Sequence, residues 1–361
     1  MNEHELKARI AAALTGVVNS RVGKDVISAG MVKEIAVEAD GLVRIAFELG
    51  NDDPADLVRE TRRAGQAVEG VRAVKVEVRA AAAPKPTTAK VVPAPTAREL
   101  PHLGRVIAVS SGKGGVGKST ITTNLAAGLA ARGHRVGLMD ADVYGPNIPR
   151  MFGVTGEQPA VVDHRLQPIE AHGVKLISVG SLIERDAATI WRGPIITKVI
   201  QQFLGDVEWG QLDYFLVDMP PGTGDAQLSL VQSVHVAAGL IVTTPQEVAV
   251  GDALRGAKMF EKVGVPVLGI VENMSFFACP HCGERTDIFA HGGGRRLADE
   301  LGVPLLAEVP LQARVQELCD SGVPVVLAEP ESPAGRALAL LAERVEREVA
   351  AKSVRLPIVT G

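Results

Sequence analysis

The nine residues GKGGVGKST, numbered 112 to 120, directly follow the apolar run Val106–Val109 and open a stretch of helical spacing, 119–132. They match the pattern G-x-x-x-x-G-K-[ST] in the setting that the pattern requires, after a buried strand and before a helix. Glycines let backbone N–H groups turn inward around phosphate oxygens, and the start of the helix adds a positive dipole. The sequence therefore predicts a loop that binds the phosphates of a nucleotide.

The residues of this loop have separate expected functions. The expected ATP-binding residues are Gly112, Lys113, Gly114, Gly115, Val116, Gly117, Lys118, Ser119 and Thr120. Among them, Lys118 is expected to neutralise the β- and γ-phosphates, and the hydroxyl of Ser119 is expected to bind Mg²⁺. Lys113 is a second lysine, which the simplest form of the pattern lacks.

Carboxylates end two further apolar runs. One run leads into Asp140 and Asp142, and the run Tyr214–Val217 leads into Asp218. Because ligands bind at the carboxyl edge of parallel strands, we expect these side chains beside the phosphate loop, with Asp218 serving Mg²⁺ through water. The segment after Asp218 is interpreted as a nucleotide-sensing switch, in which the N–H of Gly222 contacts the γ-phosphate. A single aspartate after a strand is more often a helix cap, but the three motifs together are specific.

Buried strands and helices alternate along the C-terminal part of the chain. The apolar runs are Val106–Val109, Val136–Met139, Val174–Val179, Phe215–Val217, Leu240–Val242, Val267–Val271 and Leu305–Val309. The stretches of helical spacing between or after them include 119–132, 225–235, 246–263 and 333–351. This order predicts an α/β fold, a P-loop NTPase with a mostly parallel sheet and helices on both faces.

A proline-rich segment divides the chain. Residues 80–100 contain four prolines. Since prolines fix φ and remove backbone donors, the segment predicts an extended, semi-rigid linker. Residues 1–79 show helix and strand patterns in the order αββαβ, which predicts a small α+β domain. Residues 101–361 then form the large domain with the phosphate loop.

Composition and local sequence argue against a nucleic-acid partner, a signal peptide and a membrane helix. The 361 residues are 46% hydrophobic and 22% charged, and the net charge is −4, so no basic excess indicates a nucleic-acid partner. The acidic opening Met1–Glu5 lacks the basic and apolar regions of a signal peptide. No apolar run approaches the roughly 18 residues of a membrane helix. We therefore expect a cytoplasmic protein that binds neither nucleic acid nor a membrane.

The chain has three cysteines, of which Cys279 and Cys282 form a Cys-x-x-Cys on a Pro/Gly turn. Two thiolates at this spacing suit one metal ion or one edge of a cluster, but Zn²⁺ or a [4Fe–4S] cluster normally needs four ligands. A symmetric dimer would supply four by joining two pairs. Alternatively, His281, His291 or Cys319 completes a site in one chain, or the pair is a redox dithiol. Cys319 alone is more typical of a buried structural thiol.

Several segments together resemble one family. They are Gly112–Thr120, Asp140–Pro149, Trp191–Pro194, Asp218–Asp225, Asn273–Ser275 and Cys279–Gly283. A lysine directly after the first loop glycine is typical of the deviant Walker A class of ParA and MinD ATPases. The further Cys-Pro-x-Cys after Asn-Met-Ser indicates a much narrower group within this class. Over nearly its whole length, the chain resembles the Mrp-type (ApbC-like) iron–sulfur cluster carrier ATPases.

The resemblance implies functions for residues around the nucleotide. Lys113 would reach across a dimer interface to the partner's nucleotide, although a solvated lysine is the alternative from the residues alone. Asp142 would orient or activate the attacking water, so the implied catalytic residues are Lys113, Lys118 and Asp142. Asp140 would support the metal site, and Asn273 would help to recognise adenine.

The resemblance also implies a homodimer that binds ATP and Mg²⁺. Cys279 and Cys282 of both chains would hold a labile [4Fe–4S] cluster, which passes to apo iron–sulfur proteins with the help of cluster assembly factors. Residues 1–79 would be a small iron–sulfur assembly domain. Many relatives have a cysteine and an Asp-Pro-Glu turn there, whereas this chain has Asn19-Ser20-Arg21-Val22 and no cysteine. We therefore expect this domain to dock partners or regulate, without ligating a cluster.

A second interpretation is a ParA/MinD-like partitioning or positioning ATPase in which Cys279 and Cys282 hold a structural zinc ion. Membrane positioning of the MinD kind needs a basic amphipathic C-terminal helix. The apolar stripe near the C-terminus consists of Leu338, Leu341, Val345 and Val349. Acidic residues share its helix and it has no aromatic anchor, so we expect it to pack against the core.

Overall fold

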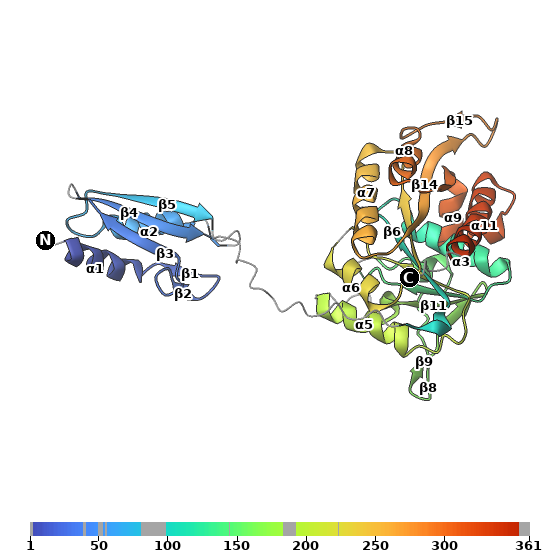
Figure 1. Ribbon diagram of the computed structural model, residues 1–361, viewed down its shortest axis with the longest axis horizontal. Helices are drawn as coiled ribbons and strands as arrows, with labels where there is room; N and C mark the ends of the chain where they lie inside the picture. Colours follow the sequence, from blue (N-terminus) through green and yellow to red (C-terminus); the bar gives the residue numbers. More distant parts are fainter. Residues whose placement is uncertain are drawn as a thin grey trace, which may run out of the picture. The chain divides into compact units, whose positions relative to one another are not determined.

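The computed structural model describes residues 3–38, 41–49, 53–54, 56–80, 99–143, 145–182, 193–222 and 224–353. The chain divides into two compact units, residues 1–92 and 93–361 (Figure 1). Most of the predicted linker, 80–100, lies outside the described residues, as do Trp191 and Arg192 of the family segment. The assignment of this segment as a linker stays a prediction.

The N-terminal unit is a small α+β structure. Its elements are α1 (Glu3–Leu14), β1 (Val18–Asn19), β2 (Lys24–Asp25), β3 (Val32–Val37), β4 (Leu42–Leu49), α2 (Asp56–Gln66) and β5 (Ala73–Ala80). Strand β4 pairs antiparallel with β3 and parallel with β5. Its alternate residues Val43, Ile45 and Phe47 are fully buried in one cluster with Ile10 of α1 and Leu57 of α2. This packing follows from the period-two pattern of the strand.

The C-terminal unit contains the phosphate loop. The strands of its large sheet are β6 (Arg105–Ser110), β7 (Val136–Asp140), β10 (Ile169–Ala171), β11 (Val174–Ser178), β12 (Tyr214–Asp218), β13 (Ala238–Thr243), β14 (Val267–Ala278), β15 (Arg285–Thr286) and β16 (Leu305–Leu311). A separate hairpin is formed by β8 (Val161–Val162) and β9 (Arg165–Leu166). The α-helices are α3 (Lys118–Ala131), α4 (Ile148–Met151), α5 (Gly193–Gly205), α6 (Asp225–Ser233), α7 (Glu247–Lys262), α8 (Gly293–Leu301), α9 (Ala313–Ser321), α10 (Val325–Ala328) and α11 (Pro333–Ser353). Two 3₁₀ helices are η1 (Pro101–Leu103) and η2 (Val179–Leu182).

The sheet is mostly parallel, which confirms the predicted fold class. Within the described ranges its order is β10-β11-β7-β12-β6-β13-β14-β15, and β16 also pairs with β14. Only the outer pairs β10–β11 and β14–β15 are antiparallel in this described sheet. Helices cover both faces (Figure 1). Antiparallel strands thus appear only at the margins, where short hairpins add them without a crossover.

Two hydrophobic clusters, one on each face, explain why the central strands read as continuous apolar runs. In β6, Ile107 and Val109 pack into the cluster that contains α3 and α11, whereas Val106 and Ala108 pack into the cluster that contains α5 and α7. Both sets are at most 3% exposed. A strand that is buried on both faces loses the alternation of apolar and polar residues.

Strand register brings the expected carboxylates together. In β12 and β7, Asp218 pairs with Asp140, and in β11 and β7, Ser178 pairs with Asp140. All three residues stand at the C-terminal ends of parallel strands, next to the loop that leaves β6. The candidate nucleotide site therefore lies at the edge of the sheet where the sequence places it.

Strand β14 is longer than the predicted run Val267–Val271, because it continues to Ala278. Its extra residues pair with β16 and form a hairpin with β15. Met274 has a φ of 52°, in the left-handed region, and the register with β16 shifts around it. The polar side chains of Glu272 and Ser275 concealed this extension in the sequence, although both are buried and hydrogen-bonded to each other.

The apolar stripe of the C-terminal helix packs inside the protein, as expected. Leu338, Leu341 and Val345 of α11 are fully buried, and Val349 is 4% exposed. Among the described helices, none combines the length and the apolar character needed to cross a membrane.

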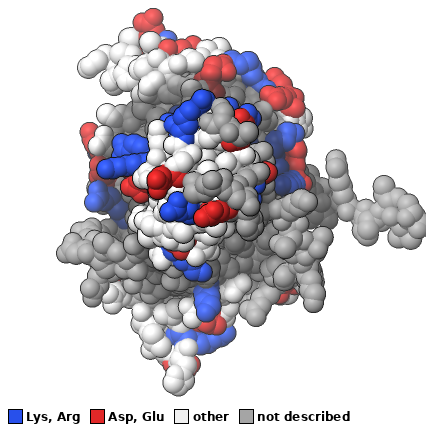
Figure 2. All heavy atoms as spheres, turned by 90° about the vertical axis from the view of Figure 1, so that its left-hand side faces the viewer, with Lys and Arg blue, Asp and Glu red and all other residues white. Residues whose placement is uncertain are grey.

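On the face that Figure 2 draws, basic and acidic side chains are interspersed.

Candidate functional site

The phosphate loop joins β6 to α3, as predicted. Gly115 and Gly117 have φ values of 82° and 80°, in the left-handed region that favours glycine. A Cβ atom at Gly117 would lie 2.1 Å from Nδ2 of Asn273, so this position needs glycine for space as well. Because α3 begins at Lys118, the unpaired N–H groups of its first turn lie at the loop.

Lys118 is buried beneath the loop, with its side chain 6% exposed. Its Nζ lies 2.8 Å from Oδ2 of Asp218, which makes an ion pair. Within the described residues, however, no acceptor is aligned for a hydrogen bond to this buried ammonium. An ammonium has three N–H donors, so Lys118 has donors available for phosphate oxygens.

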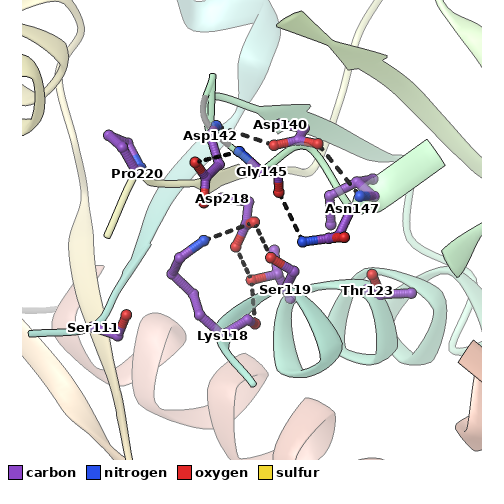
Figure 3. Close-up of polar contacts among 12 residues, drawn as sticks. Ser111, Lys118, Ser119, Thr123, Asp140, Asp142, Gly145, Asn147, Asp218 and Pro220 are labelled. Atoms are coloured by element: carbon purple, nitrogen blue, oxygen red, sulfur yellow. Dashed lines mark hydrogen bonds and ion pairs between the residues drawn. The ribbon is translucent and has the colours of Figure 1, made fainter. Parts of the chain in front are cut away.

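The carboxylate of Asp218 lies within hydrogen-bond distance of two hydroxyl groups of α3 (Figure 3). The Oγ of Ser119 donates to Oδ2 of Asp218 at 2.6 Å, and Oγ1 of Thr122 lies 2.7 Å from Oδ1. Carboxylate and hydroxyl oxygens are the ligands that Mg²⁺ prefers. The donor set therefore fits the predicted metal site at Ser119 and Asp218.

Asp140 is fully buried and, among the described residues, accepts hydrogen bonds from three groups. Its Oδ1 accepts from the N–H of Asp142 at 3.1 Å, and its Oδ2 accepts from the N–H of Ile148 at 3.3 Å and from Oγ of Ser178 at 3.0 Å. Burial, followed by the nearby charge of Asp218, raises the pKa of Asp140 above its ordinary value. A bound cation would offset this unfavourable charge, which fits a position in the surroundings of Mg²⁺.

The loop after β7 presents Asp142 to the site (Figure 3). Oδ1 of Asp142 accepts from the N–H of Gly145 at 3.2 Å, and Nδ2 of Asn147 donates to the carbonyl of Gly145 at 2.8 Å. Asp142 is 8% exposed. These turn contacts hold its carboxylate at the wall of the cavity.

An open cavity of about 160 Å³ lies over the phosphate loop. Its lining residues are Ser111, Lys113, Gly114, Gly115, Gly117, Lys118, Ser119, Thr120, Asp142, Asn147, Met151 and Pro221. The predicted catalytic residues Lys113, Lys118 and Asp142 thus line one cavity. A polar hollow with glycine backbone, a buried ammonium and hydroxyls suits a chain of phosphates.

Gly222 and Asn273 are already engaged with the phosphate-loop segment. The N–H of Gly222, whose φ is 96°, donates to the carbonyl of Ser111 at 3.3 Å. Nδ2 of Asn273 donates to the carbonyl of Val116 at 2.9 Å, and the residue is 6% exposed. The expected contacts of Gly222 with the γ-phosphate and of Asn273 with adenine stay predictions.

The cysteine pair forms the tip of the hairpin between β14 and β15. The N–H of Cys279 donates to the carbonyl of Glu284 at 2.9 Å, and the N–H of Gly283 donates to the carbonyl of Cys279 at 2.8 Å. Cys282 is exposed and Cys279 is half-buried. Hydrogen bonds from the N–H groups of Cys282 and then His281, and from the Cys282 thiol, lower the pKa of Cys279. A lowered pKa favours the thiolate, which is the form that binds a metal.

The other predicted single-chain ligands have different surroundings. Nδ1 of His291 lies 3.3 Å from Oδ2 of Asp287. Cys319 is buried in α9, where it shares a hydrogen bond with the side chain of Thr120 and where burial raises its pKa. Within the described ranges, no three histidine, cysteine or acidic side chains meet in a metal-binding arrangement.

Two residues of the site are not singled out by any sequence motif. Thr122 lies one helical turn after Lys118 and is buried against Asp218. Ser178 is the last residue of the buried strand β11, as Asp140 and Asp218 are the last residues of β7 and β12. A polar residue that ends a buried strand is the available signal for Ser178, and it applies to serine as well as to aspartate.

Two family models match separate parts of the chain. A family described as ParA, "NUBPL iron-transfer P-loop NTPase", matches residues 102–346. A family described as "Iron-sulfur cluster assembly protein" matches residues 7–78. The two matched ranges fall within the two compact units.

Curated relatives and solved structures agree with these matches. An iron-sulfur cluster carrier protein of Synechocystis sp. is 44% identical over 350 residues, covering 94% of this chain and 97% of the relative. One of Deinococcus radiodurans is 44% identical over 348 residues, covering 95% of each. A nucleotide-binding protein from Archaeoglobus fulgidus, solved with ADP, is 41% identical with a TM-score of 0.57, covering 65% of this chain and 91% of that one.

The cell division ATPase MinD of Pyrococcus furiosus is a more distant structural neighbour. It is 26% identical with a TM-score of 0.52, covering 68% of this chain and 99% of its own. The carrier proteins match more of this chain at higher identity than MinD does. With its phosphate loop, its carboxylates and its cysteine hairpin, the chain belongs to the family of NUBPL-type iron-transfer P-loop NTPases.

Proposed function

We propose that this protein is an ATP-hydrolysing carrier that receives a labile [4Fe–4S] cluster as cargo and passes it to apo-proteins. One observation carries the proposal: a single strand, β14, joins the two sites. Its residue Asn273 donates to the phosphate loop, and the strand runs on to the hairpin that bears Cys279 and Cys282. This shared strand supports a function that links the nucleotide site to the thiol pair.

The charged residues around the cavity account for phosphoryl transfer. Lys118 is expected to offset phosphate charge, and Asp142 is expected to hold the attacking water in line. Lys113 is expected to act on the nucleotide of a partner chain. Mg²⁺ bound near Ser119 and Asp218, with Asp140 in support, would neutralise charge on the β- and γ-phosphate oxygens.

The cargo site needs two copies of the chain. A [4Fe–4S] cluster takes four thiolates, and each hairpin offers two. A two-fold axis through the paired hairpins supplies all four with identical geometry. We therefore propose a homodimer that holds the cluster between Cys279 and Cys282 of both chains, with apo iron–sulfur proteins as recipients and cluster assembly factors as partners.

Anaerobic reconstitution with iron and sulfide tests the cargo site. The wild type is expected to take up about two iron atoms per chain and to run as a dimer, since one cluster joins two chains. Cys279→Ala and Cys282→Ala are expected to lose the iron, whereas the matched control Cys319→Ala retains it. Iron content that is unchanged in both hairpin variants would falsify the proposal. Zinc without sulfide in protein purified anaerobically would also contradict it.

Hydrolysis of ATP is tested separately. Lys118→Ala is expected to lower kcat at least about 100-fold, because a buried cation that offsets phosphate charge is removed. The exposed Lys258 of α7, which pairs with Glu261, provides the control Lys258→Ala. Phosphate release that is equal in the Lys118 variant and the wild type would contradict the assignment.

A further inference from the structure

The loop that carries Asp142 is tied at both ends to one carboxylate. The N–H of Asp142 at its start and the N–H of Ile148 at its end both donate to Asp140, at 3.1 and 3.3 Å. Because Asp140 is fully buried, its orientation sets where the two ends of the loop lie.

Ser178 is a partner of Asp140 that lies outside this loop. It stands at the end of β11, opposite Asp140 in the parallel register, and is fully buried. Its Oγ donates to Oδ2 of Asp140 at 3.0 Å and accepts from the N–H of Gly180 at 3.1 Å. A hydroxyl has one hydrogen, so the bond from Gly180 leaves that hydrogen for Asp140.

Gly180 supports the same loop by a steric contact. A Cβ atom at Gly180 would lie 2.6 Å from Cβ and 2.5 Å from Cγ of Pro146. The proline ring is rigid, and it packs against the bare backbone of Gly180. The hydroxyl of Ser178 and the backbone of Gly180 thus hold two different points of one loop.

We propose that Ser178 and Gly180 are positioning residues for ATP hydrolysis, which hold the loop between β7 and α4 so that Asp142 stays at the wall of the phosphate cavity. Neither residue lines that cavity. They act through Asp140 and Pro146. The inference rests on the proposed ATPase function and adds to it a support that the sequence motifs do not contain.

The kinetic test compares Ser178→Ala and Gly180→Ala with the wild type. Each is expected to lower kcat by about 10- to 100-fold, because a small displacement of Asp142 spoils the alignment of the attacking water. The affinity for ATP, measured by equilibrium binding, is expected to change less than about threefold, since the phosphate loop is untouched. Ser178→Thr keeps the hydroxyl and is expected to recover most of kcat.

Two features separate positioning from a general loss of structure. Both changes disturb the same loop, so the loss of kcat in the double variant is expected to be smaller than the product of the losses in the two single variants. The matched control is Ser233→Ala, which removes a hydroxyl that donates to the carbonyl of Ser229 within α6. This control is expected to retain the wild-type kcat.

Hydrogen exchange gives a readout that is independent of hydrolysis. In Ser178→Ala, the amides of Asp142 and Ile148 are expected to exchange at least about tenfold faster, because their common acceptor loses its support. Unchanged exchange together with unchanged kcat overturns the inference, as does an equal loss of kcat and ATP affinity. If Ser178→Ala exchanges faster than the wild type but the wild type does not hydrolyse ATP, the proposed function is wrong, while the support of the loop by Ser178 is confirmed.

Discussion

At the scale of the residue, Gly117 combines a conformational and a steric requirement. Its φ is 80°, and its missing side chain leaves room for the amide of Asn273, which in turn donates to the carbonyl of Val116. The same amide would collide with any larger residue. Gly117 therefore shapes the phosphate loop together with a strand more than 150 positions away in the sequence.

Gly117→Ala is expected to lower the affinity for ATP at least about tenfold, since both the backbone and Asn273 must shift. The matched control is Gly133→Ala, because Gly133 has a φ of 91° but open space where a Cβ atom would lie, with no contact within 4 Å. That control is expected to cost about 1 kcal/mol of stability and to bind ATP normally. Equal ATP affinities for the two variants would show that the close approach of Asn273 to Gly117 does not affect ATP binding.

Because of the ion pair of Asp213 with Arg135, the free energy of unfolding is expected to fall at acidic pH. Hydrogen bonds from the Arg135 side chain and then its backbone N–H lower the pKa of Asp213 from 3.8 to about 2. A depressed carboxylate pKa stabilises the fold above the unfolded value, and this stabilisation is lost as the pH falls through the folded value. The relevant window is therefore from about pH 4 down to pH 2.

Asp213→Asn is expected to flatten the fall in the free energy of unfolding across that window. Because the Asp213 side chain is 34% exposed, solvent screening limits the difference to at most about 1 kcal/mol. Urea unfolding at pH 4 and near pH 2 measures it. Glu261→Gln, in an exposed pair within α7, serves as the control. Identical pH dependence of the wild type and Asp213→Asn would rule out the ion pair as the cause.

At the scale of the element, α11 shows how a helix with mixed charges belongs to the core. Its apolar stripe packs against α3 and the sheet, and only its other faces are exposed. Arg344 donates to the carbonyl of Leu306 at 2.8 Å, which ties the helix to β16. Packing, and not membrane contact, accounts for the stripe within the described residues.

Adjacent leucines of α11 allow a matched test. Leu341 is fully buried and Leu340 is 39% exposed. Leu341→Ala is expected to lower the free energy of unfolding by about 2–5 kcal/mol, whereas Leu340→Ala changes it by less than about 0.5 kcal/mol. Chemical denaturation of both variants provides the comparison. A similar cost for the two would show that the stripe is not in the core.

At the scale of the whole molecule, the chemistry belongs to one of the two units. The phosphate loop, the carboxylates and the cysteine hairpin all lie within residues 93–361, which have their own core. In the N-terminal unit, Asn19 is buried and donates to Asp53 at 3.0 Å, and Arg21 pairs with Asp53 at 2.7 Å. The turn at Asn19 is thus held by hydrogen bonds. The docking or regulatory function expected of this unit stays a prediction.

A chain shortened to residues 99–361 is expected to fold, to hydrolyse ATP within about threefold of the full-length rate, and to accept iron and sulfide, because the cores of the two units are separate. Delivery to an apo-protein is the step expected to slow when residues 1–98 are missing. Parallel assays of hydrolysis, iron content and transfer separate these outcomes. Loss of iron uptake by the shortened chain would show that the N-terminal unit takes part in holding the cargo.

The sequence alone determined the α/β class, the phosphate loop, and the placement of Asp140 and Asp218 at strand ends and of Asp142 just after one, because these depend on local patterns. A continuous apolar run, a glycine-rich turn and a helical period each arise within a few residues. The same locality limited the prediction of β14. The buried Glu272 and Ser275 satisfy each other, so a polar stretch continues as a strand.

Only the tertiary structure decided how distant residues meet. Ser178 reaches Asp140 across 38 positions, Thr122 reaches Asp218 across 96, and Asn273 reaches Val116 across 157. Serine, threonine and asparagine are mostly exposed in folded proteins, so their types alone do not predict that these three are buried at one site. Register and packing, which depend on the whole core, supply the partners that local patterns leave undetermined.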